Sequence, residues 1–265
     1  MNSRALLILL HGTAMTGAQW APYAALLADV ADVRAPDLPG HGTRAAQGFS
    51  MDAAVSTVEA LITAECGRAV VLAGHSLGGY VAMAVAERHP DTLAGLVLIG
   101  SAVEPVGRGS GLYRGLARCY DWLGPDRMAH TSRRWLRRML DVRVWRALDA
   151  GGFYYGAVTP AWTAVMASSR LAQLRAVRCP VLVLGGAWDQ LHLGARRCAA
   201  AAPQGRVVTA PRRHHLWPMT HPDEVAAELR AFIASLPEPA SADPLTKQAV
   251  SACPFSANSY AICSP

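Results

Sequence analysis

Long apolar runs are absent from this sequence of 265 residues. Near the N-terminus, the stretch MNSRALLILLHG contains an apolar run of only six residues. A helix that spans a bilayer needs about 20 apolar residues, and the core of a secretory signal peptide needs about 7–15. The sequence therefore predicts neither a membrane span nor a secretion signal, and we expect a soluble, cytoplasmic protein.

Cysteine is scarce and shows no pairing pattern. The six cysteines are scattered without a C-x-x-C pair, at positions 66, 119, 179, 198, 253 and 263. A zinc site or a disulfide framework needs cysteines at short, regular spacings. Neither pattern is present, so we expect no metal site and no disulfide scaffold.

Charged residues are also few, at 17%, and the net charge of +6 comes from one segment. Between residues 104 and 176, twelve Arg stand against four Asp, whereas the rest of the chain is slightly acidic. Trp122, Trp135 and Trp145 alternate with these arginines at helix-like intervals, and no nucleic-acid-binding motif is present. We interpret the segment as a solvated helix face, with contact to an anionic group of a substrate as the alternative. We expect no nucleic-acid or membrane partner; the sequence does not set the oligomeric state.

Short apolar runs alternate with stretches of helical period. The apolar runs predict strands over Ala5–Leu10, Val30–Ala35, Ala69–Ala73, Leu93–Ile99, Val181–Leu184 and Arg206–Thr209. The periodic stretches predict helices over Gly17–Leu27, Met51–Cys66, Leu77–Arg88, Leu193–Ala201 and Asp223–Leu236. Most of the strands are apolar on both faces, as parallel strands covered by helices on each side are. The fold class predicted is α/β, with a doubly wound, mostly parallel sheet of about six strands flanked by helices.

The alternation stops between Val103 and Ala176. This segment has no strand-like run and contains nine of the 18 aromatic residues. Because a strand of the same sheet resumes at Val181, we expect a helical cap, or lid, inserted into a core made of residues 1–102 and 177–236. Residues 237–265 are rich in Pro, Ser and Ala without periodicity, which predicts a mobile tail.

The sequence GHSLG at 74–78 fits the G-x-S-x-G pattern of a nucleophile elbow. A serine on a sharp turn from strand to helix has a strained backbone, and the flanking glycines avoid clashes between side chains. The turn would expose the Ser76 hydroxyl and leave the Leu77 N–H at a helix start, where it can stabilise an oxyanion. The alternative is a tight turn with an incidental serine.

A serine needs a base and an orienting acid to act as a nucleophile at neutral pH. Asp189 follows the strand at 181–184, and His214, His215 and His221 follow the last strand. The order Ser76, Asp189, His215 is the chain order of such triads in doubly wound folds, and each residue lies just after a strand. Glu104 is an alternative acid, although it lies further from its strand end.

Four motifs together resemble the α/β-hydrolase superfamily over Leu6 to Leu236. They are HG at 11–12, DLPGHG at 37–42, GHSLGG at 74–79 and HLWPMTHPDEV at 215–225. In that family a Pro follows the catalytic His by seven residues, which selects His215 through Pro222. His214 stands where the family usually has Gly, so it stays open as the alternative base. The family's second oxyanion donor is a backbone N–H just after HG, which implies Thr13, or else Ala14.

Several other polar residues accompany these motifs. We expect His11 to make a structural hydrogen bond and Asp37 and His41 to shape the DLPGHG loop. His192 is expected on an exposed loop, with a place in the lining of the site as the alternative. Trp188 and Trp217 flank the acid and the base, where each would either line a substrate site or pack against its loop.

The resemblance implies a serine hydrolase that cleaves a carboxylic ester, lactone or thioester of a small, largely apolar substrate through an acyl-enzyme. Such chemistry needs no metal or organic cofactor. The expected partner is a small ester-like molecule, and the arginines would suit one that carries an anionic group. Carbon–carbon bond hydrolysis or a lyase reaction uses the same residues, and a hydrolase-like protein that binds a ligand without turnover is the remaining alternative.

Overall fold

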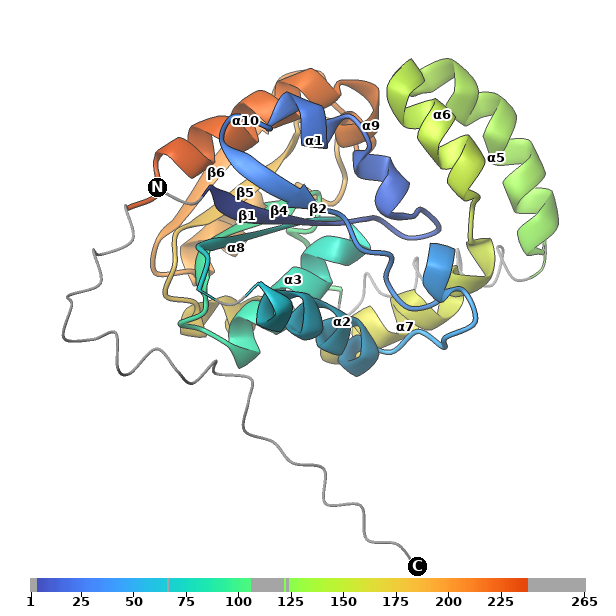
Figure 1. The fold of residues 1–265 in the computed structure, drawn as a ribbon. Helices are drawn as coiled ribbons and strands as arrows, with labels where there is room; N and C mark the ends of the chain where they lie inside the picture. The colour runs from blue at the N-terminus through green and yellow to red at the C-terminus, as the bar shows by residue number, and fades with distance from the viewer. Residues whose placement is uncertain (1–3, 66, 106–121, 123, 238–265) are drawn as a thin grey trace, which may run out of the picture.

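The computed structural model describes residues 4–65, 67–105, 122 and 124–237. Its centre is a six-stranded sheet with the strand order β2-β1-β3-β4-β5-β6, in which every pair is parallel (Figure 1). The strands are β1 Ala5–Leu10, β2 Ala31–Arg34, β3 Val70–His75, β4 Leu93–Ile99, β5 Val181–Gly186 and β6 Gly205–Ala210. The predicted fold class is confirmed, because each apolar run forms a strand of one parallel sheet.

Helices cover both faces of this sheet (Figure 1). One face carries α2 Met51–Ala64, α3 Leu77–Arg88 and α8 Ala195–Ala201, and the other carries α1 Tyr23–Leu26 and α10 Pro222–Ala234. Alternate side chains of a strand point to opposite faces. In β1, Leu6, Ile8 and Leu10 therefore join the first core and Leu7 and Leu9 the second, all fully buried. This two-sided burial explains why the four inner strands β1, β3, β4 and β5 have no polar face, whereas the edge strands β2 and β6 carry exposed polar residues.

The helix predicted over Gly17–Leu27 is wrong as a single element. The structure has a 3₁₀ turn, η1 Gly17–Trp20, followed by the short helix α1. Pro22 lies between the two and has no N–H, so it cannot continue the hydrogen-bond ladder of a preceding helix. The break directs Trp20 and Tyr23 into the core beneath α10.

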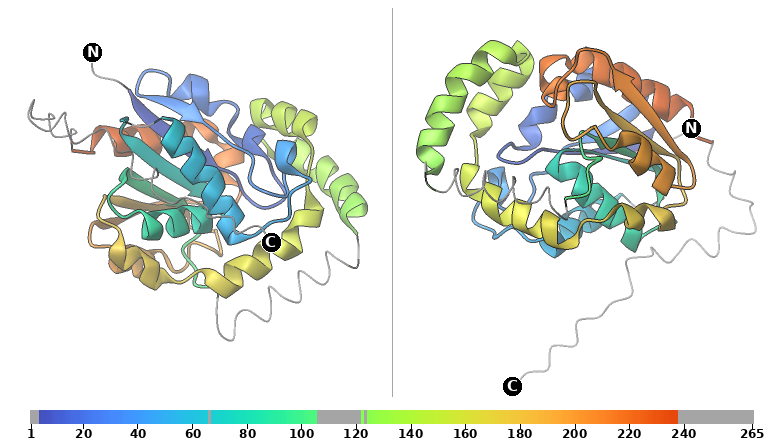
Figure 2. Two further views of the ribbon diagram at one scale, coloured as in Figure 1. Left: turned by 60° about the horizontal axis from the view of Figure 1, so that its bottom comes forward. Right: turned by 180° about the vertical axis from the view of Figure 1, so that it is seen from behind.

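The described part of the chain between β4 and β5 contains helices and loops, without a strand. Its elements are α5 Pro125–Met139, α6 Val142–Gly151, η4 Tyr155–Ala157, α7 Val158–Ser168 and η5 Leu171–Ala176. Helices α5 and α6 lie side by side at one end of the molecule (Figure 2). They enclose a small third core with Met15 and Met219. The predicted cap also includes residues 106–121 and 123, which lie outside the described residues, as does the predicted tail from residue 238.

No helix among the described residues is long and apolar enough to cross a membrane. The same part of the chain contains no group of three or more His, Cys, Asp or Glu side chains placed to hold a metal ion.

Candidate active site

Ser76 occupies a strained turn between β3 and α3. Its φ of 53° and ψ of −115° are values that residues other than glycine rarely adopt. A Cβ on Gly74 would lie 2.2 Å from the carbonyl carbon of Gly78, and a Cβ on Gly78 would lie 2.4 Å from the Leu10 carbonyl oxygen. The two glycines of the G-x-S-x-G pattern are therefore required by close backbone approach, and strain of this kind accumulates at functional sites.

Two backbone N–H groups beside Ser76 have no acceptor among the described residues. Leu77 is the first residue of α3, so its N–H has no partner within the helix. The N–H of Thr13 likewise makes no hydrogen bond there. By contrast, the N–H of Ala14 donates to Nε2 of His41 over 3.2 Å. Of the two residues that follow HG, Thr13 is thus the one that can donate to an oxyanion.

Asp189 and His215 form a hydrogen-bonded pair at the carboxyl ends of β5 and β6. His215 Nδ1 lies 3.0 and 3.1 Å from the two carboxylate oxygens of Asp189. Burial would raise the pKa of Asp189, but hydrogen bonds from His215 and from the N–H of Leu191 outweigh it and lower that pKa. The ionised carboxylate accepts the Nδ1 proton, so the neutral imidazole keeps Nε2 free to act as a base.

The three predicted residues come together at one edge of the sheet. His75, which precedes Ser76, lies with its ring centroid 4.8 Å from that of His215. Gly100, at the end of β4, allows the pair to approach, because a Cβ there would lie 2.6 Å from Asp189 Oδ2 and 3.0 Å from His215 Nδ1. No hydrogen bond joins the Ser76 hydroxyl to His215. Such bonds commonly tighten only once substrate is bound.

The alternative acid and base have other partners. Nδ1 of His214 accepts the N–H of Leu216 over 3.2 Å and so closes a local turn. A carboxylate oxygen of Glu104 accepts the N–H of Leu171 over 3.3 Å. Neither side chain takes part in the Asp189–His215 pair.

The polar residues of the neighbouring loops hold the backbone in place. His11 accepts the N–H of Leu38 at Nε2 and donates from Nδ1 to the Gly12 carbonyl oxygen, each over 2.9 Å. Asp37 accepts from the N–H groups of Gly17 and Thr43, each over 2.8 Å. These hydrogen bonds fit the structural roles predicted for His11, Asp37 and His41.

The expectation of an exposed His192 is wrong, since only 5% of the residue is exposed. Its Nε2 lies 2.8 Å from the Thr209 hydroxyl, and its ring packs against Gly185, where a Cβ would lie 2.4 Å from Nδ1. The missing side chain of Gly185 makes room for the imidazole inside the fold. Trp217 is buried and donates to Glu224 over 2.8 Å, and Trp188 is 66% exposed.

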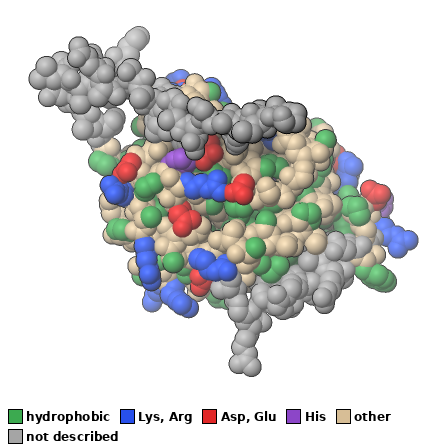
Figure 3. Space-filling view, turned by 90° about the horizontal axis from the view of Figure 1, so that it is seen from below, with side chains coloured by type: hydrophobic (Ala, Val, Ile, Leu, Met, Phe, Trp, Pro, Cys, Tyr) green, Lys and Arg blue, Asp and Glu red, His purple; other side chains and the backbone are tan. Residues whose placement is uncertain are grey.

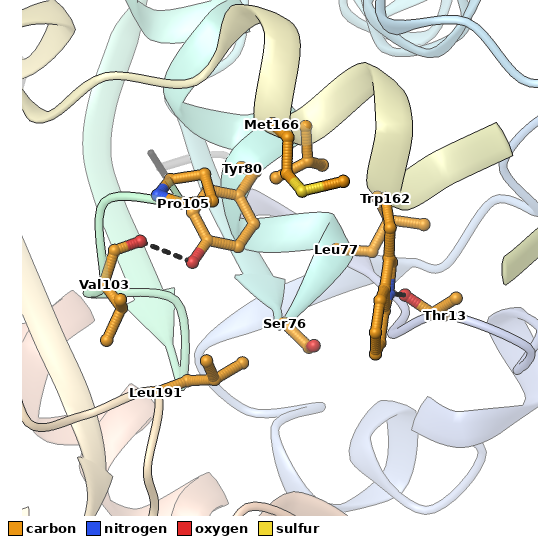
Figure 4. A pocket seen from close by; sticks show the side chains of 10 residues that line it. Thr13, Ser76, Leu77, Tyr80, Val103, Pro105, Trp162, Met166 and Leu191 are labelled. Carbon is orange, nitrogen blue, oxygen red and sulfur yellow. Dashed lines mark hydrogen bonds between the residues drawn. The ribbon is translucent and has the colours of Figure 1, made fainter. Parts of the chain in front are cut away.

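A cavity of about 50 Å³ opens beside Ser76 (Figure 4). Its described lining is mostly apolar and consists of Thr13, Ser76, Leu77, Tyr80, Val103, Pro105, Trp162, Val165, Met166 and Leu191. Trp162, from α7, donates from Nε1 to the Thr13 hydroxyl over 3.1 Å. The Tyr80 hydroxyl donates to the Val103 carbonyl oxygen over 2.7 Å. The helix predicted to belong to a cap thus forms one wall of the cavity and contacts the loop after β1.

Sequence reasoning did not single out Trp162, His75 or Gln19. Trp162 belonged to the aromatic group of the predicted cap, which was its only signal. His75 occupies the undefined second position of G-x-S-x-G, and nothing in the sequence marks Gln19.

The buried imidazoles lead to a prediction about acid stability. Burial lowers the pKa of both His11 and His75 from 6.5 to about 3, whereas in the unfolded chain each titrates near 6.5. Between pH 3 and 6.5 the unfolded state therefore binds more protons, and the free energy of unfolding rises with pH. We expect the urea midpoint to fall between pH 7 and pH 5 with an unchanged m-value. Equal midpoints at both pH values would contradict neutral, buried imidazoles.

Comparisons with known proteins show the family to which the chain is related. A family model described as alpha/beta hydrolase family matches residues 7–228. A pimeloyl-(acyl-carrier protein) methyl ester esterase from Aromatoleum aromaticum is 32% identical over 83% of this chain and 94% of its own length. Lipase LipV from Mycobacterium tuberculosis is 40% identical over 100 residues, 37% of this chain and 38% of its own. Among solved structures, a thermophilic esterase from Thermogutta terrifontis matches with a TM-score of 0.71, 23% identity and coverage of 88% of this chain and 91% of its own.

Proposed function

This chain belongs to the alpha/beta hydrolase family, and we propose that it hydrolyses a carboxylic ester through Ser76, Asp189 and His215. The observation that carries the proposal is the Asp189–His215 pair beside the strained turn of Ser76. A buried carboxylate that fixes the imidazole tautomer is the arrangement a serine nucleophile needs.

The reaction proceeds through an acyl-enzyme. His215 Nε2 takes the proton of the Ser76 hydroxyl as Oγ attacks the ester carbonyl, and the N–H groups of Thr13 and Leu77 stabilise the oxyanion. His215 then gives its proton to the departing alcohol. A water, deprotonated by His215, then attacks the acyl carbonyl. The bond from that carbon to Ser76 Oγ breaks, His215 returns the proton to Oγ, and the carboxylic acid is released. Each oxyanion donor contributes about 10²–10³ in rate.

The experiment that tests this function combines a covalent probe with an ester panel. The purified protein is treated with a fluorophosphonate, and its turnover of p-nitrophenyl acetate, butyrate and octanoate is measured. We expect one adduct per chain, on Ser76, and multiple turnovers on the short esters. Tight retention of an ester without turnover would instead favour a ligand-binding protein, and cleavage of a carbon–carbon bond or cyanohydrin without ester hydrolysis would favour a lyase.

The cavity beside Ser76 favours an ester with one short side. One water needs about 10–15 Å³ of cavity volume, so a cavity of about 50 Å³ admits only a small apolar group. We expect Trp162→Ala to widen the cavity and to raise kcat/KM for the octanoate relative to the acetate by about 10-fold. The control is Trp188→Ala, whose side chain is exposed outside the described lining. An unchanged ratio in Trp162→Ala would place the substrate elsewhere.

A basic helix pair suggests that the long side of the ester is attached to an acidic carrier protein. Seven arginines of α5 and α6 are exposed, and five of them form no ion pair with a described residue, namely Arg127, Arg134, Arg137, Arg138 and Arg146. On the face shown in Figure 3, by contrast, side chains of both signs are interspersed. The Aromatoleum aromaticum relative is named for an ester on acyl-carrier protein, and a basic surface of this kind would attract such a partner.

If the substrate is bound to a carrier protein, removing the exposed arginines should lower activity on the carrier-bound ester but not on the free ester. The double substitution Arg134→Glu and Arg138→Glu should lower kcat/KM for a methyl ester carried on an acidic acyl carrier protein by about 10-fold. The same variant should hydrolyse the free methyl ester at the wild-type rate, because those side chains lie outside the cavity lining. Arg196→Glu on α8 is the control for a charge change elsewhere. An equal loss on both substrates would argue against carrier docking.

A further inference from the structure

A buried pair of side chains, Gln19 and His75, connects the three loops of the site. Gln19 is fully buried, and 2% of His75 is exposed. The amide oxygen of Gln19 accepts the N–H of Gly12 over 2.9 Å, and its Nε2 donates to His75 Nδ1 over 3.1 Å. His75 Nε2 in turn donates to the carbonyl oxygen of His215 over 2.9 Å.

The donor and the acceptor of each of these three hydrogen bonds follow from the chemistry of the groups. The Gly12 N–H can only donate, so the Gln19 oxygen faces it and the amide nitrogen faces His75. An amide nitrogen cannot accept, hence His75 Nδ1 carries no proton. The proton of the neutral imidazole is therefore on Nε2, where the His215 carbonyl oxygen accepts it. Burial, reinforced by the nearby His215, lowers the pKa of His75 to about 3, in agreement with a neutral ring.

The residues at both ends of this series of hydrogen bonds are next to, or are, groups that act in the proposed reaction. Gly12 precedes Thr13, one of the two oxyanion donors, and His75 precedes Ser76. His215 is the base itself. The approach to the HG motif is close, because a Cβ on Gly12 would lie 3.0 Å from His75 Nδ1, so a side chain there would press on the imidazole.

We propose that Gln19 and His75 are positioning residues that set the oxyanion loop, the Ser76 turn and the His215 loop in one mutual geometry. The proposal rests on the ester hydrolase function above. Both ring nitrogens of His75 are engaged within the protein, so His75 acts through its neighbours and does not touch substrate. Misplacement by about 1 Å costs up to about 10²-fold in rate, so the effect should appear in kcat.

Two substitutions of His75 separate positioning from packing. His75→Phe keeps a ring of similar size and removes both hydrogen bonds. His75→Gln loses the ring and offers an amide oxygen to Gln19 and an amide N–H to the His215 carbonyl. We expect kcat for p-nitrophenyl acetate, per site titrated with fluorophosphonate, to fall by about 10–100-fold in His75→Phe and to be largely recovered in His75→Gln, with KM nearly unchanged in both.

Gln19→Leu tests the same positioning role if His75→Phe fails to fold. It removes the hydrogen bonds to Gly12 and His75 and should lower kcat by the same factor. In the double variant of Gln19→Leu and His75→Phe, the losses should be far from additive, because both break one chain of bonds. His89→Gln is the control, since His89 Nε2 bonds Glu59 over 2.7 Å, outside the cavity lining.

Three results decide the matter. A wild-type kcat in His75→Phe, or a lower kcat in His75→Gln than in His75→Phe, would overturn the positioning role and leave the ester hydrolase intact. A wild-type protein that neither reacts with the fluorophosphonate nor hydrolyses esters would overturn the proposed function, and the positioning role with it. A low kcat in His75→Phe together with a nearly wild-type kcat in His75→Gln would support both the positioning role and the ester hydrolase function.

Discussion

Replacing Ser76 by Ala is expected to abolish covalent labelling by a fluorophosphonate and to lower kcat for short esters on the order of 10⁶-fold. The hydroxyl oxygen is the atom that becomes acylated, and no other group of the proposed mechanism can replace it. Losses of this size are typical when a serine triad loses its nucleophile. The measurement is the labelling stoichiometry by intact mass, together with kcat for p-nitrophenyl acetate.

Ser101→Ala is the matched control for this prediction. The Ser101 hydroxyl is buried without a hydrogen-bond partner among the described residues, and it lies beside α3, where a Cβ on Gly79 would be 2.0 Å away. Its removal should leave labelling and turnover unchanged. Persistent labelling of Ser76→Ala at a different residue would mean that the strained turn does not present the nucleophile. Substantial turnover by Ser76→Ala would assign the reaction to another site.

The second large effect is a loss of kcat/KM that is expected for substitution of His215 but not of the adjacent His214. His215→Asn should lower kcat/KM on the order of 10⁶-fold, because the amide can still donate to Asp189 but offers no basic nitrogen to Ser76. His214→Asn should change kcat/KM by less than about 10-fold, since His214 serves a local turn through Leu216. Both variants are measured with p-nitrophenyl acetate at pH 8.

The retained donor in His215→Asn protects the fold. Removing the partner of a buried carboxylate altogether would leave Asp189 as an uncompensated charge and destabilise the protein. Thermal unfolding of the two variants should therefore differ little. A severe loss of activity in His214→Asn together with an active His215→Asn would exchange the proposed roles of the two residues.

Much of the fold was predictable because its signals are local in the sequence. Six apolar runs separated by periodic stretches indicate a parallel sheet with helices on both faces, since only strands covered on each side lack a polar face. The turn at Ser76 was also predictable, because Gly74 and Gly78 are required by contacts within a few residues of the serine or with the adjacent strand β1. The single helix predicted from Gly17 to Leu27 is interrupted at Pro22. The prediction followed the helical periodicity of the stretch, although the proline is itself a local signal of a break.

The remaining questions about the site depended on contacts between distant loops. Whether Thr13 or Ala14 offers a free N–H depends on His41, which accepts from Ala14 across 27 positions. The burial of His192 depends on the space left by Gly185.

The sequence by itself thus predicted the α/β class and the serine turn, because strand periodicity and the G-x-S-x-G pattern are local signals. Through the family resemblance it also predicted Ser76 and Asp189 with either His215 or His214 as the base. Only the tertiary structure decided that His215 rather than His214 faces Asp189. It also brought together Gln19 and His75, whose hydrogen bonds join segments up to 140 positions apart. A hydrogen bond depends on where two loops meet in space, and adjacent residues such as His214 and His215 differ only in the direction in which the folded loop points their side chains.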